Sequence, residues 1–423
     1  MSAESDWNHR LDLVLDMVRE MSEQTDPQQM VYLYGQRNQQ LVQVDGLLGL
    51  SRRGLKDGEY KITRSRAWAT PIDPWKEPHR LPQYRGGLLS DLIYGDQPVV
   101  IDDLRLNDDE PAAEHLRGFR SLLAIPNFDG GKALNMVILL QKAPHAFERE
   151  KIPEIVLRSN LFGRATQNLV LAAELRTAYA EVDRELRAVA EIQRGLLPQA
   201  MPQIPRLELA ASYQMCRRAG GDYYDFFPLA DGRWGLLIAD VSGHGTPAAV
   251  VMAVTHSLAH TVPGSAQPPS RLLGYVNEQL SARYSPASGT FVTAFYAVFD
   301  PSDLSLTYSS AGHNPPRVKR CSDGTVRSLT SEDGLPLGLL ESCQYSDTRI
   351  QLMTGDQLVL YTDGITEAMN PEGELFSTQR LDLILSGCSP AQQLHDAILE
   401  SLAGFARGRA ADDDRTLVIG RVL

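Results

Sequence analysis

The sequence contains little cysteine, and its cysteines lie far apart. The four residues are Cys216, Cys321, Cys343 and Cys388, and no two of them form a CxxC pair. Disulfide-rich domains and zinc ribbons both depend on closely spaced or paired cysteines. We therefore expect neither a disulfide framework nor a cysteine-ligated zinc site in this chain.

Long apolar runs are also missing from the sequence. No run approaches the roughly 20 residues that a membrane-spanning helix requires. The N-terminal segment, MSAESDWNHRLDLVLDMVRE, has neither a basic leading part nor a continuous apolar stretch, so we expect no signal peptide. These absences predict a cytoplasmic protein with no membrane partner.

The chain has no surplus of positive charge. Its 41 lysines and arginines against 53 aspartates and glutamates give a formal net charge of −12. Such a chain repels phosphate groups, so we expect no general binding of nucleic acid. The 423 residues suffice for two or three domains of ordinary globular composition, with 43% hydrophobic and 22% charged residues.

The N-terminal part of the chain is predicted to contain a helix followed by a mixed domain. Apolar residues at helical spacing predict an amphipathic helix over 6–23, within a segment assigned to residues 1–27. Alternating or apolar runs between loops rich in Pro, Gly and Asp predict an α+β domain over residues 28–155. Its sheet is expected to be antiparallel.

Residues 156–202 differ from the segments on either side. Apolar side chains recur every seven residues at Leu175, Val182, Val189 and Leu196. This heptad spacing is typical of a coiled coil, so the segment is predicted to be a linker helix that forms a homodimer. A helix packed against its own domain is the alternative.

Residues 203–423 are predicted to form a strand-rich domain. Helical patterns occur at 246–260, 268–283 and 389–406. Strands are expected at Leu207–Tyr213, Trp234–Val241, Phe291–Phe299, Leu304–Ser309, Thr325–Leu329, Gln357–Thr362 and Thr416–Val422.

Four acidic clusters in this domain lie at strand ends or in glycine-rich turns. They are GGDYYD from Gly220, IADVSGHG from Ile238, VLYTDG from Val359 and DDDRT from Asp412. Carboxylates brought together beside buried strands repel each other, and a divalent cation removes that cost. Ligation by oxygen alone favours Mg²⁺ or Mn²⁺ over zinc. The clusters predict metal-assisted hydrolysis of a phosphoester.

Each cluster taken alone has a second interpretation. Asp363-Gly364 is also compatible with a hairpin turn, and Asp412 to Asp414 with a solvated loop. Asp240 is less ambiguous, because Gly243-His244-Gly245 follows it and opens a predicted helix.

The C-terminal 220 or so residues resemble the SpoIIE-type branch of the metal-dependent protein serine/threonine phosphatases. The resemblance rests on several motifs in the family's order: LLP with MP from Leu196, then GGDYYDF, ADVSGHG, FVTAFYAVFD, SAGHNPP, LPLG, LYTDGITEA and DDDRTLVI. It implies a sandwich of two antiparallel sheets flanked by helices. With the N-terminal domain, the fold class is α+β.

The resemblance also implies a ligand set for two Mn²⁺ or Mg²⁺ ions. Asp240 would bridge both ions and the carbonyl of Val241 would bind one, with Asp222 and Asp363 completing the site alongside a fourth carboxylate. The fourth is assigned to Asp413 rather than Asp414, because Asp413 lies three residues before Thr416, as in the family pattern.

The implied reaction is direct attack of a metal-bound water, without a covalent enzyme intermediate. Asp240, Asp222 and Asp363 would be the catalytic residues. Arg217 and Arg218 precede the GGD motif and could contact the substrate phosphate, the alternative being that they face solvent. The implied substrate is phosphoserine or phosphothreonine on a regulatory protein, typically an anti-sigma-factor antagonist of the STAS type.

Two further motifs are similar to motifs of other enzyme classes, but their sequence context does not match those classes. Cys321 and Arg327 match the C-x5-R loop of cysteine-dependent phosphatases, yet strand-like residues flank the loop and Asp323-Gly324 predicts a turn there. GGDYYDF is similar to the GGDEF motif of diguanylate cyclases, but Tyr223 replaces its glutamate. His313, followed by Asn-Pro-Pro, is interpreted as part of a rigid turn.

Residues 28–155 weakly resemble a GAF domain, a sensing module, through GFRSLLAIP from Gly118. A purely structural dimerising domain is the alternative. For the whole chain, two other functions stay open: a pseudophosphatase that binds its phosphorylated partner without hydrolysis, and a metal-dependent phosphatase of a small molecule.

Overall fold

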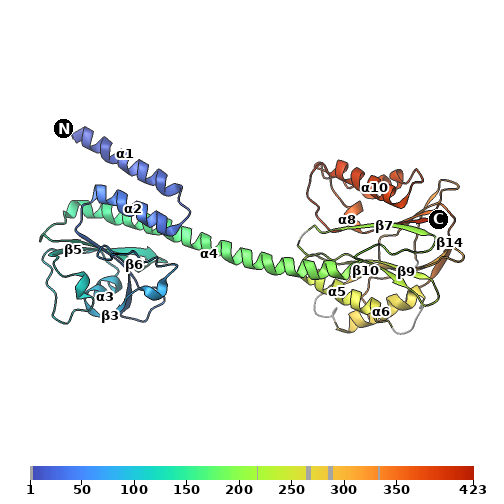
Figure 1. The fold of residues 1–423 in the computed structure, drawn as a ribbon, viewed down its shortest axis with the longest axis horizontal. Helices are drawn as coiled ribbons and strands as arrows, with labels where there is room; N and C mark the ends of the chain where they lie inside the picture. The colour runs from blue at the N-terminus through green and yellow to red at the C-terminus, as the bar shows by residue number, and fades with distance from the viewer. Residues whose placement is uncertain (1–2, 217, 263–267, 284–288, 332–333) are drawn as a thin grey trace. The chain divides into compact units, whose positions relative to one another are not determined.

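The computed structural model describes residues 3–216, 218–262, 268–283, 289–331 and 334–423 (Figure 1). The chain separates into two compact units, Met1–Tyr179 and Ala180–Leu423. Helix α4 (Ile152–Leu196) contains the boundary between them. Among the described residues, no helix combines the length and apolar character needed to cross a lipid bilayer.

The N-terminal unit is built on one antiparallel sheet with the strand order β3-β2-β1-β6-β5-β4. The strands are β1 (Gly46–Ser51), β2 (Glu59–Ser65), β3 (Gln83–Arg85), β4 (Val99–Ile101), β5 (Ser121–Asp129) and β6 (Lys132–Gln141). The helices are α1 (Ala3–Ser22), α2 (Pro27–Leu41), α3 (Gly87–Tyr94) and the first part of α4, with three short 3-10 turns η1 (Pro78–Arg80), η2 (Ala113–His115) and η3 (Arg149–Lys151). The expected α+β domain with an antiparallel sheet is confirmed.

The two faces of this sheet pack against different helices. On one face, strand residues such as Leu48 and Ile138 pack with Leu89 and Ile93 of α3. On the other face, Leu123 and neighbouring residues form a second cluster with the start of α4. Alternating side chains along β1 join the two clusters in turn, because Leu48 and Leu50 belong to the first and Leu47 packs against the second.

The C-terminal unit contains two five-stranded antiparallel sheets. The first has the order β14 (Thr348–Gln351), β11 (Ser305–Ala311), β10 (Val292–Asp300), β9 (Trp234–Val241) and β8 (Tyr223–Pro228). The second has the order β13 (Val326–Ser328), β12 (Arg317–Lys319), β15 (Gln357–Tyr361), β16 (Arg415–Val422) and β7 (Leu207–Gln214).

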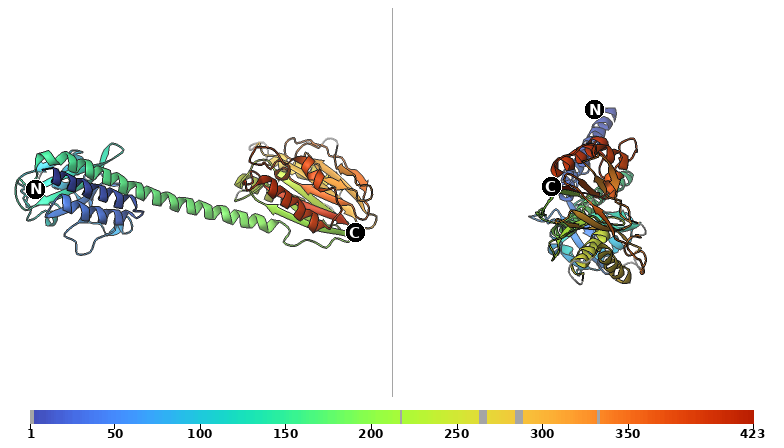
Figure 2. Two further views of the ribbon diagram at one scale, coloured as in Figure 1. Left: turned by 90° about the horizontal axis from the view of Figure 1, so that it is seen from above. Right: turned by 90° about the vertical axis from the view of Figure 1, so that its right-hand side faces the viewer.

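Helices cover the outer face of each sheet in this unit (Figures 1 and 2). Helices α5 (Thr246–His260) and α6 (Pro269–Arg283) pack on the first sheet. Helices α8 (Asp363–Thr366), α9 (Ser377–Ile384) and α10 (Ala391–Ala406) lie beside the second. The unit is therefore the four-layer αββα sandwich that the resemblance implied.

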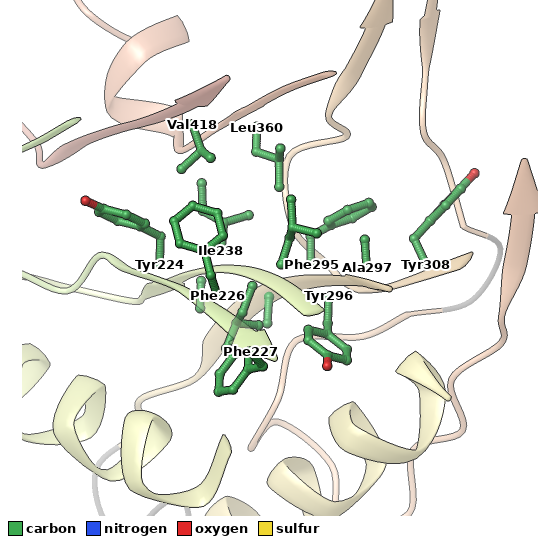
Figure 3. Close-up of a cluster of buried hydrophobic side chains, with 14 of the residues drawn as sticks. Tyr224, Phe226, Phe227, Ile238, Phe295, Tyr296, Ala297, Tyr308, Leu360 and Val418 are labelled. Carbon is green, nitrogen blue, oxygen red and sulfur yellow. The ribbon is translucent and has the colours of Figure 1, made fainter. Parts of the chain in front are cut away.

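The core between the two sheets is made of large apolar side chains (Figure 3). Tyr224 and Phe295 lie on the side of the first sheet that faces Leu360 and Val418 of the second. Phe227 points to the opposite side, toward the helices. Burial of each such side chain contributes about 1.5–3 kcal/mol, so the stacked sheets form a rigid base for the loops at their ends.

One expectation from the cysteine content is wrong. Cys321, just after β12, forms a disulfide with Cys388, in the connection between α9 and α10, with a Cα–Cα distance of 6.0 Å. The two residues are 67 positions apart in sequence, and only the packing of α9 and α10 against the second sheet brings them together. Cysteine spacing along a chain therefore could not indicate this bond.

Candidate metal centre

Four carboxylates from both sheets converge at one end of the C-terminal unit. Asp222 directly precedes β8 and Asp240 lies near the end of β9, whereas Asp363 begins α8 after β15 and Asp413 precedes β16. The negative charges of Asp222, Asp363 and Asp413 all act on the carboxyl group of Asp240. The structure thus brings together all four acidic residues that the motifs singled out.

Asp222 connects the two sheets through its side chain. Its Oδ2 accepts a hydrogen bond from Thr362 Oγ1 at 2.7 Å and another from Thr416 Oγ1 at 2.6 Å. The residue is only 2% exposed. Burial raises the pKa of Asp222 above its ordinary value, and the two threonine hydrogen bonds offset that rise only in part.

The carboxyl groups of Asp240 and Asp363 also have raised pKa values. Burial raises the pKa of Asp240, and repulsion from its three acidic neighbours raises it further. Burial and the charge of Asp413 raise the pKa of Asp363 to about 6. Several carboxylates with raised pKa values and all-oxygen ligands are what a hard divalent cation stabilises, so the residues fit Mg²⁺ or Mn²⁺.

Two glycines allow the segments of the site to approach closely. A Cβ atom at Gly221 would lie 2.7 Å from the carbonyl oxygen of Val241, the backbone ligand expected from the resemblance. A Cβ atom at Gly364 would lie 1.9 Å from the carbonyl oxygen of Asp414. Both positions therefore require glycine for steric reasons, independent of any ligand.

Asp413 and Asp414 have different environments. Asp414 is 3% exposed, and its two oxygens accept hydrogen bonds from the backbone amides of Cys216 at 2.9 Å and Gly221 at 2.7 Å. Asp413 is exposed, and its charge acts on Asp240 and Asp363. Both oxygens of Asp414 therefore hold backbone amides, whereas Asp413 accepts one amide, that of Asp414 at 2.8 Å, through Oδ1. The assignment of Asp413 as the ligand stays a prediction.

Of the two arginines proposed for phosphate contact, only Arg218 lies within the described residues. Arg217 lies outside the described residues. Arg218 forms an ion pair with Asp183 of α4, at 2.7 Å between Nη2 and Oδ1. A role of Arg218 in phosphate binding therefore stays a prediction, and its observed partner belongs to the linker helix.

Several contacts of the centre were not indicated by the sequence. Thr362 and Thr416 hold Asp222, Asp414 clamps the GGD segment, and Gln193 of α4 hydrogen-bonds to Gly220. Thr362 and Thr416 each lie next to an acidic cluster and form a recognisable pattern in retrospect. Gln193 carries no such signal, because it is one polar residue among many on a long helix.

The competing C-x5-R interpretation does not hold in the structure. Cys321 is bonded to Cys388, so its thiol is not free to act as a nucleophile. Asp323 and Gly324 form the turn between β12 and β13, where Asp323 Oδ1 accepts a hydrogen bond from the amide of Thr325 at 2.9 Å. Strand β13 directly follows this turn, whereas the cysteine mechanism needs a helix N-terminus there to bind phosphate.

Comparisons with known proteins identify relatives of the C-terminal part of the chain. A family model described as stage II sporulation protein E (SpoIIE) matches residues 230–423. Phosphoserine phosphatase RsbU of Bacillus subtilis is 31% identical over 248 residues, which cover 58% of this chain and 73% of RsbU. Phosphoserine phosphatase RsbP of Bacillus subtilis is 24% identical over 239 residues, covering 56% of this chain and 57% of RsbP.

One further curated protein and one solved structure are also similar to this chain. Protein IcfG of Synechocystis is 28% identical over 260 residues, covering 55% of this chain and 41% of IcfG. The chain thus spans less than two thirds of IcfG and RsbP. Among solved structures, the SiaA-PP2C domain of Pseudomonas aeruginosa has a TM-score of 0.52 at 21% identity, covering 58% of this chain and 98% of that domain. This last similarity supports the fold alone.

Proposed function

Because the chain belongs to the SpoIIE family of PP2C-type serine phosphatases, we propose that it hydrolyses phosphoserine or phosphothreonine on a regulatory protein. The observation that carries the proposal is the convergence of Asp222, Asp240, Asp363 and Asp413 at one end of the sandwich. Such a cluster is unfavourable by itself and becomes favourable around divalent cations, which is the arrangement that phosphoryl transfer uses.

The proposed site contains metal ligands and residues that orient them. Asp222, Asp240, Asp363, Asp413 and the Val241 carbonyl would hold two Mn²⁺ or Mg²⁺ ions. When bound, such ions neutralise phosphoryl oxygens and lower the pKa of a water that attacks phosphorus in line. Thr362 and Thr416 would keep the Asp222 carboxylate oriented, because both donate to the same oxygen.

The proposed substrate is a phosphorylated anti-sigma-factor antagonist of the STAS type. Two curated relatives, RsbU and RsbP, are named phosphoserine phosphatases, which supports a phosphorylated serine as the target. Two alternatives are a pseudophosphatase that only binds this partner and a phosphatase of a small molecule. The acidic ligand set argues against the first alternative, and substrate assays distinguish the second.

The N-terminal unit is proposed to regulate the phosphatase. In this organisation residues 1–27 are an N-terminal helix, 28–155 a GAF-like sensor, 156–202 the linker and 203–423 the phosphatase domain. The proposed homodimer forms through α4, which exposes large apolar side chains that water would otherwise surround. They are Leu171, Leu175, Tyr179, Val182 and Ile192, with exposed fractions of 51%, 56%, 68%, 53% and 69%.

The activity is tested by hydrolysis of para-nitrophenyl phosphate with millimolar Mn²⁺ or Mg²⁺. We expect turnover that EDTA abolishes and that Asp240→Asn removes. If the full chain is folded but inactive, residues 200–423 are assayed next, followed by a phosphorylated STAS-type protein, nucleotides and sugar phosphates. Absence of metal-dependent turnover in every one of these assays would contradict the proposal and leave the pseudophosphatase.

The dimer is tested by light scattering on the full chain. Leu175→Glu combined with Val182→Glu places charge on the heptad seam and is expected to produce monomers. Arg176→Glu, at a position outside the seam on the same helix, serves as the control and should leave the mass unchanged. A wild-type chain that is monomeric at micromolar concentration would contradict the proposed dimer.

A further inference from the structure

A second cluster of metal-ligating side chains lies on the outer face of the first sheet of the C-terminal unit. Asp225 of β8 meets His256 and His260 of α5, and their nearest ligand atoms all lie within 4.8 Å of one another. The two histidines are four residues apart, so they project from the same face of the helix. None of the three belongs to the carboxylate centre described above.

Strand alternation explains why Asp225 reaches this cluster. Successive side chains of β8 point to opposite faces, and Tyr224 lies on the face toward the other sheet, whereas Phe227 points toward the helices (Figure 3). Asp225 shares the face of Phe227. On that face it meets α5, and the Phe227 ring lies 4.9 Å from the ring of His260.

The spacing of the ligand atoms suits a tetrahedral ion. Asp225 Oδ2 lies 2.8 Å from His260 Nε2 and 3.8 Å from His256 Nδ1. With metal–ligand bonds of about 2.0–2.1 Å, neighbouring ligand atoms of a tetrahedral site lie about 3.3 Å apart. The two Asp225 distances fall on either side of this value, and the ligand atoms of the two histidines lie within 4.8 Å of each other.

A neighbouring tyrosine holds the carboxylate in place. Tyr223 Oη donates to Asp225 Oδ2 at 2.6 Å and lies 3.0 Å from His256 Nδ1. Partners of this kind orient the ligands of metal sites and affect affinity strongly. The side chain of Asp225 is 11% exposed, that of His256 21% and that of His260 43%, so the site opens to solvent on the His260 side.

From this geometry we propose that Asp225, His256 and His260 form an accessory zinc-binding site. Two imidazoles and one carboxylate suit Zn²⁺ better than Mg²⁺ or Mn²⁺, which prefer oxygen ligands. Solvent water would take the fourth position.

The site would join two elements that lie next to proposed ligands of the carboxylate centre. Helix α5 starts at Thr246, five residues after Val241, and β8 starts directly after Asp222. A zinc ion held between His256, His260 and Asp225 would therefore join α5 to β8. Its expected effect is greater thermal stability of the C-terminal unit.

The test is zinc binding by the full chain after treatment with chelator, measured by competition with a chromophoric zinc indicator. We expect one tight site in the wild type and in Asp240→Asn, which alters only the carboxylate centre. His256→Gln with His260→Gln should weaken this binding at least about 100-fold, and Tyr223→Phe about 10-fold. His79→Gln, an exposed histidine of the other unit, is the matched control and should bind as the wild type does.

Folding, thermal stability and Co²⁺ absorption are measured on the same variants. Circular dichroism checks that the double histidine variant is folded, and zinc should raise the melting temperature of the wild type but not of this variant. Co²⁺ in place of zinc should give intense visible absorption that the double variant lacks. Equal zinc affinity in wild type and folded double variant, or loss of the tight site in Asp240→Asn alone, would overturn the proposal. Because the readout is binding, its outcome is independent of phosphatase activity.

Discussion

The side chain of Gln193 holds both backbone groups of Gly220. Its Nε2 donates to the carbonyl oxygen of Gly220 at 2.6 Å, and the amide of Gly220 donates to its Oε1 at 3.1 Å. Gln193 is 2% exposed and belongs to the last turns of α4, whereas Gly220 lies two residues before Asp222. Helix α4 thus contacts the backbone of the candidate metal centre directly.

We predict that Gln193→Ala weakens metal binding at the centre. The substitution leaves two buried backbone groups of Gly220 without partners, which costs about 1–3 kcal/mol and loosens the segment that carries Asp222. The Mn²⁺ concentration for half-maximal turnover should rise about 10-fold or more. Titration of activity with Mn²⁺ measures this change.

The matched control is Gln199→Ala. Gln199 also donates its side-chain amide to backbone carbonyls, those of Arg194 and Leu197 at 2.8 Å each, but it does not contact the GGD segment. Its substitution should leave the Mn²⁺ requirement unchanged. Equal shifts in the two variants would show that the Gln193 contact has no particular role.

Substitutions of the neighbouring residues Asp413 and Asp414 are predicted to have different effects on metal requirement and stability. Asp413→Asn should raise the metal requirement strongly with little change in stability, because the residue is exposed and acts through its charge. Asp414→Asn should lower stability by about 1–3 kcal/mol, because its oxygens accept the amides of Cys216 and Gly221. Thermal melting in EDTA and Mn²⁺ titration separate the two effects. A large stability loss in Asp413→Asn would contradict this assignment.

The disulfide between Cys321 and Cys388 is predicted to stabilise the fold without taking part in catalysis. It closes a loop of 67 residues, and removal of such a bond typically costs about 2–4 kcal/mol. Cys321→Ser should therefore melt at lower temperature and keep its metal-dependent turnover. Dithiothreitol should lower the wild type to the level of the variant. Loss of turnover in a folded Cys321→Ser variant would contradict this prediction and would support a mechanism with Cys321 as the nucleophile.

Acid is predicted to destabilise the C-terminal unit through His313. Burial lowers the pKa of His313 from 6.5 to about 4, and its Nδ1 lies 2.9 Å from Thr293 Oγ1. Between about pH 4 and pH 6.5, His313 is protonated in the unfolded chain and neutral in the folded chain. The contribution of the neutral ring to stability is therefore complete above about pH 6.5 and is lost as the pH falls toward 4.

The measurement for His313 is urea denaturation across this pH range. His313→Gln should show a weaker loss of stability on acidification, by roughly 3 kcal/mol, and His79→Gln should behave as the wild type. A His313→Gln variant with the same pH dependence as the wild type would contradict the prediction.

Much of the fold could be predicted from local patterns. The expected helix at 246–260 matches α5 (Thr246–His260), and the expected strand Trp234–Val241 matches β9, because apolar residues and the turn residues at their ends mark both elements. Helices α2 and α3 and strands β8, β12 and β14 were not predicted. Asp363-Gly364, compatible with a hairpin turn by sequence, instead starts α8 after β15.

The sequence by itself determined the fold class, the long linker helix and the acidic residues of the centre, because hydrophobic period and motif order are local properties of the chain. Only the tertiary structure decided which groups complete that centre. Gln193 and Gly220 are 27 residues apart, Cys321 and Cys388 are 67 apart, and Asp414 and Gly221 are 193 apart. Contacts over such separations exist only after the helices and sheets have packed, since no residue carries a local signal of the partner that folding brings to it.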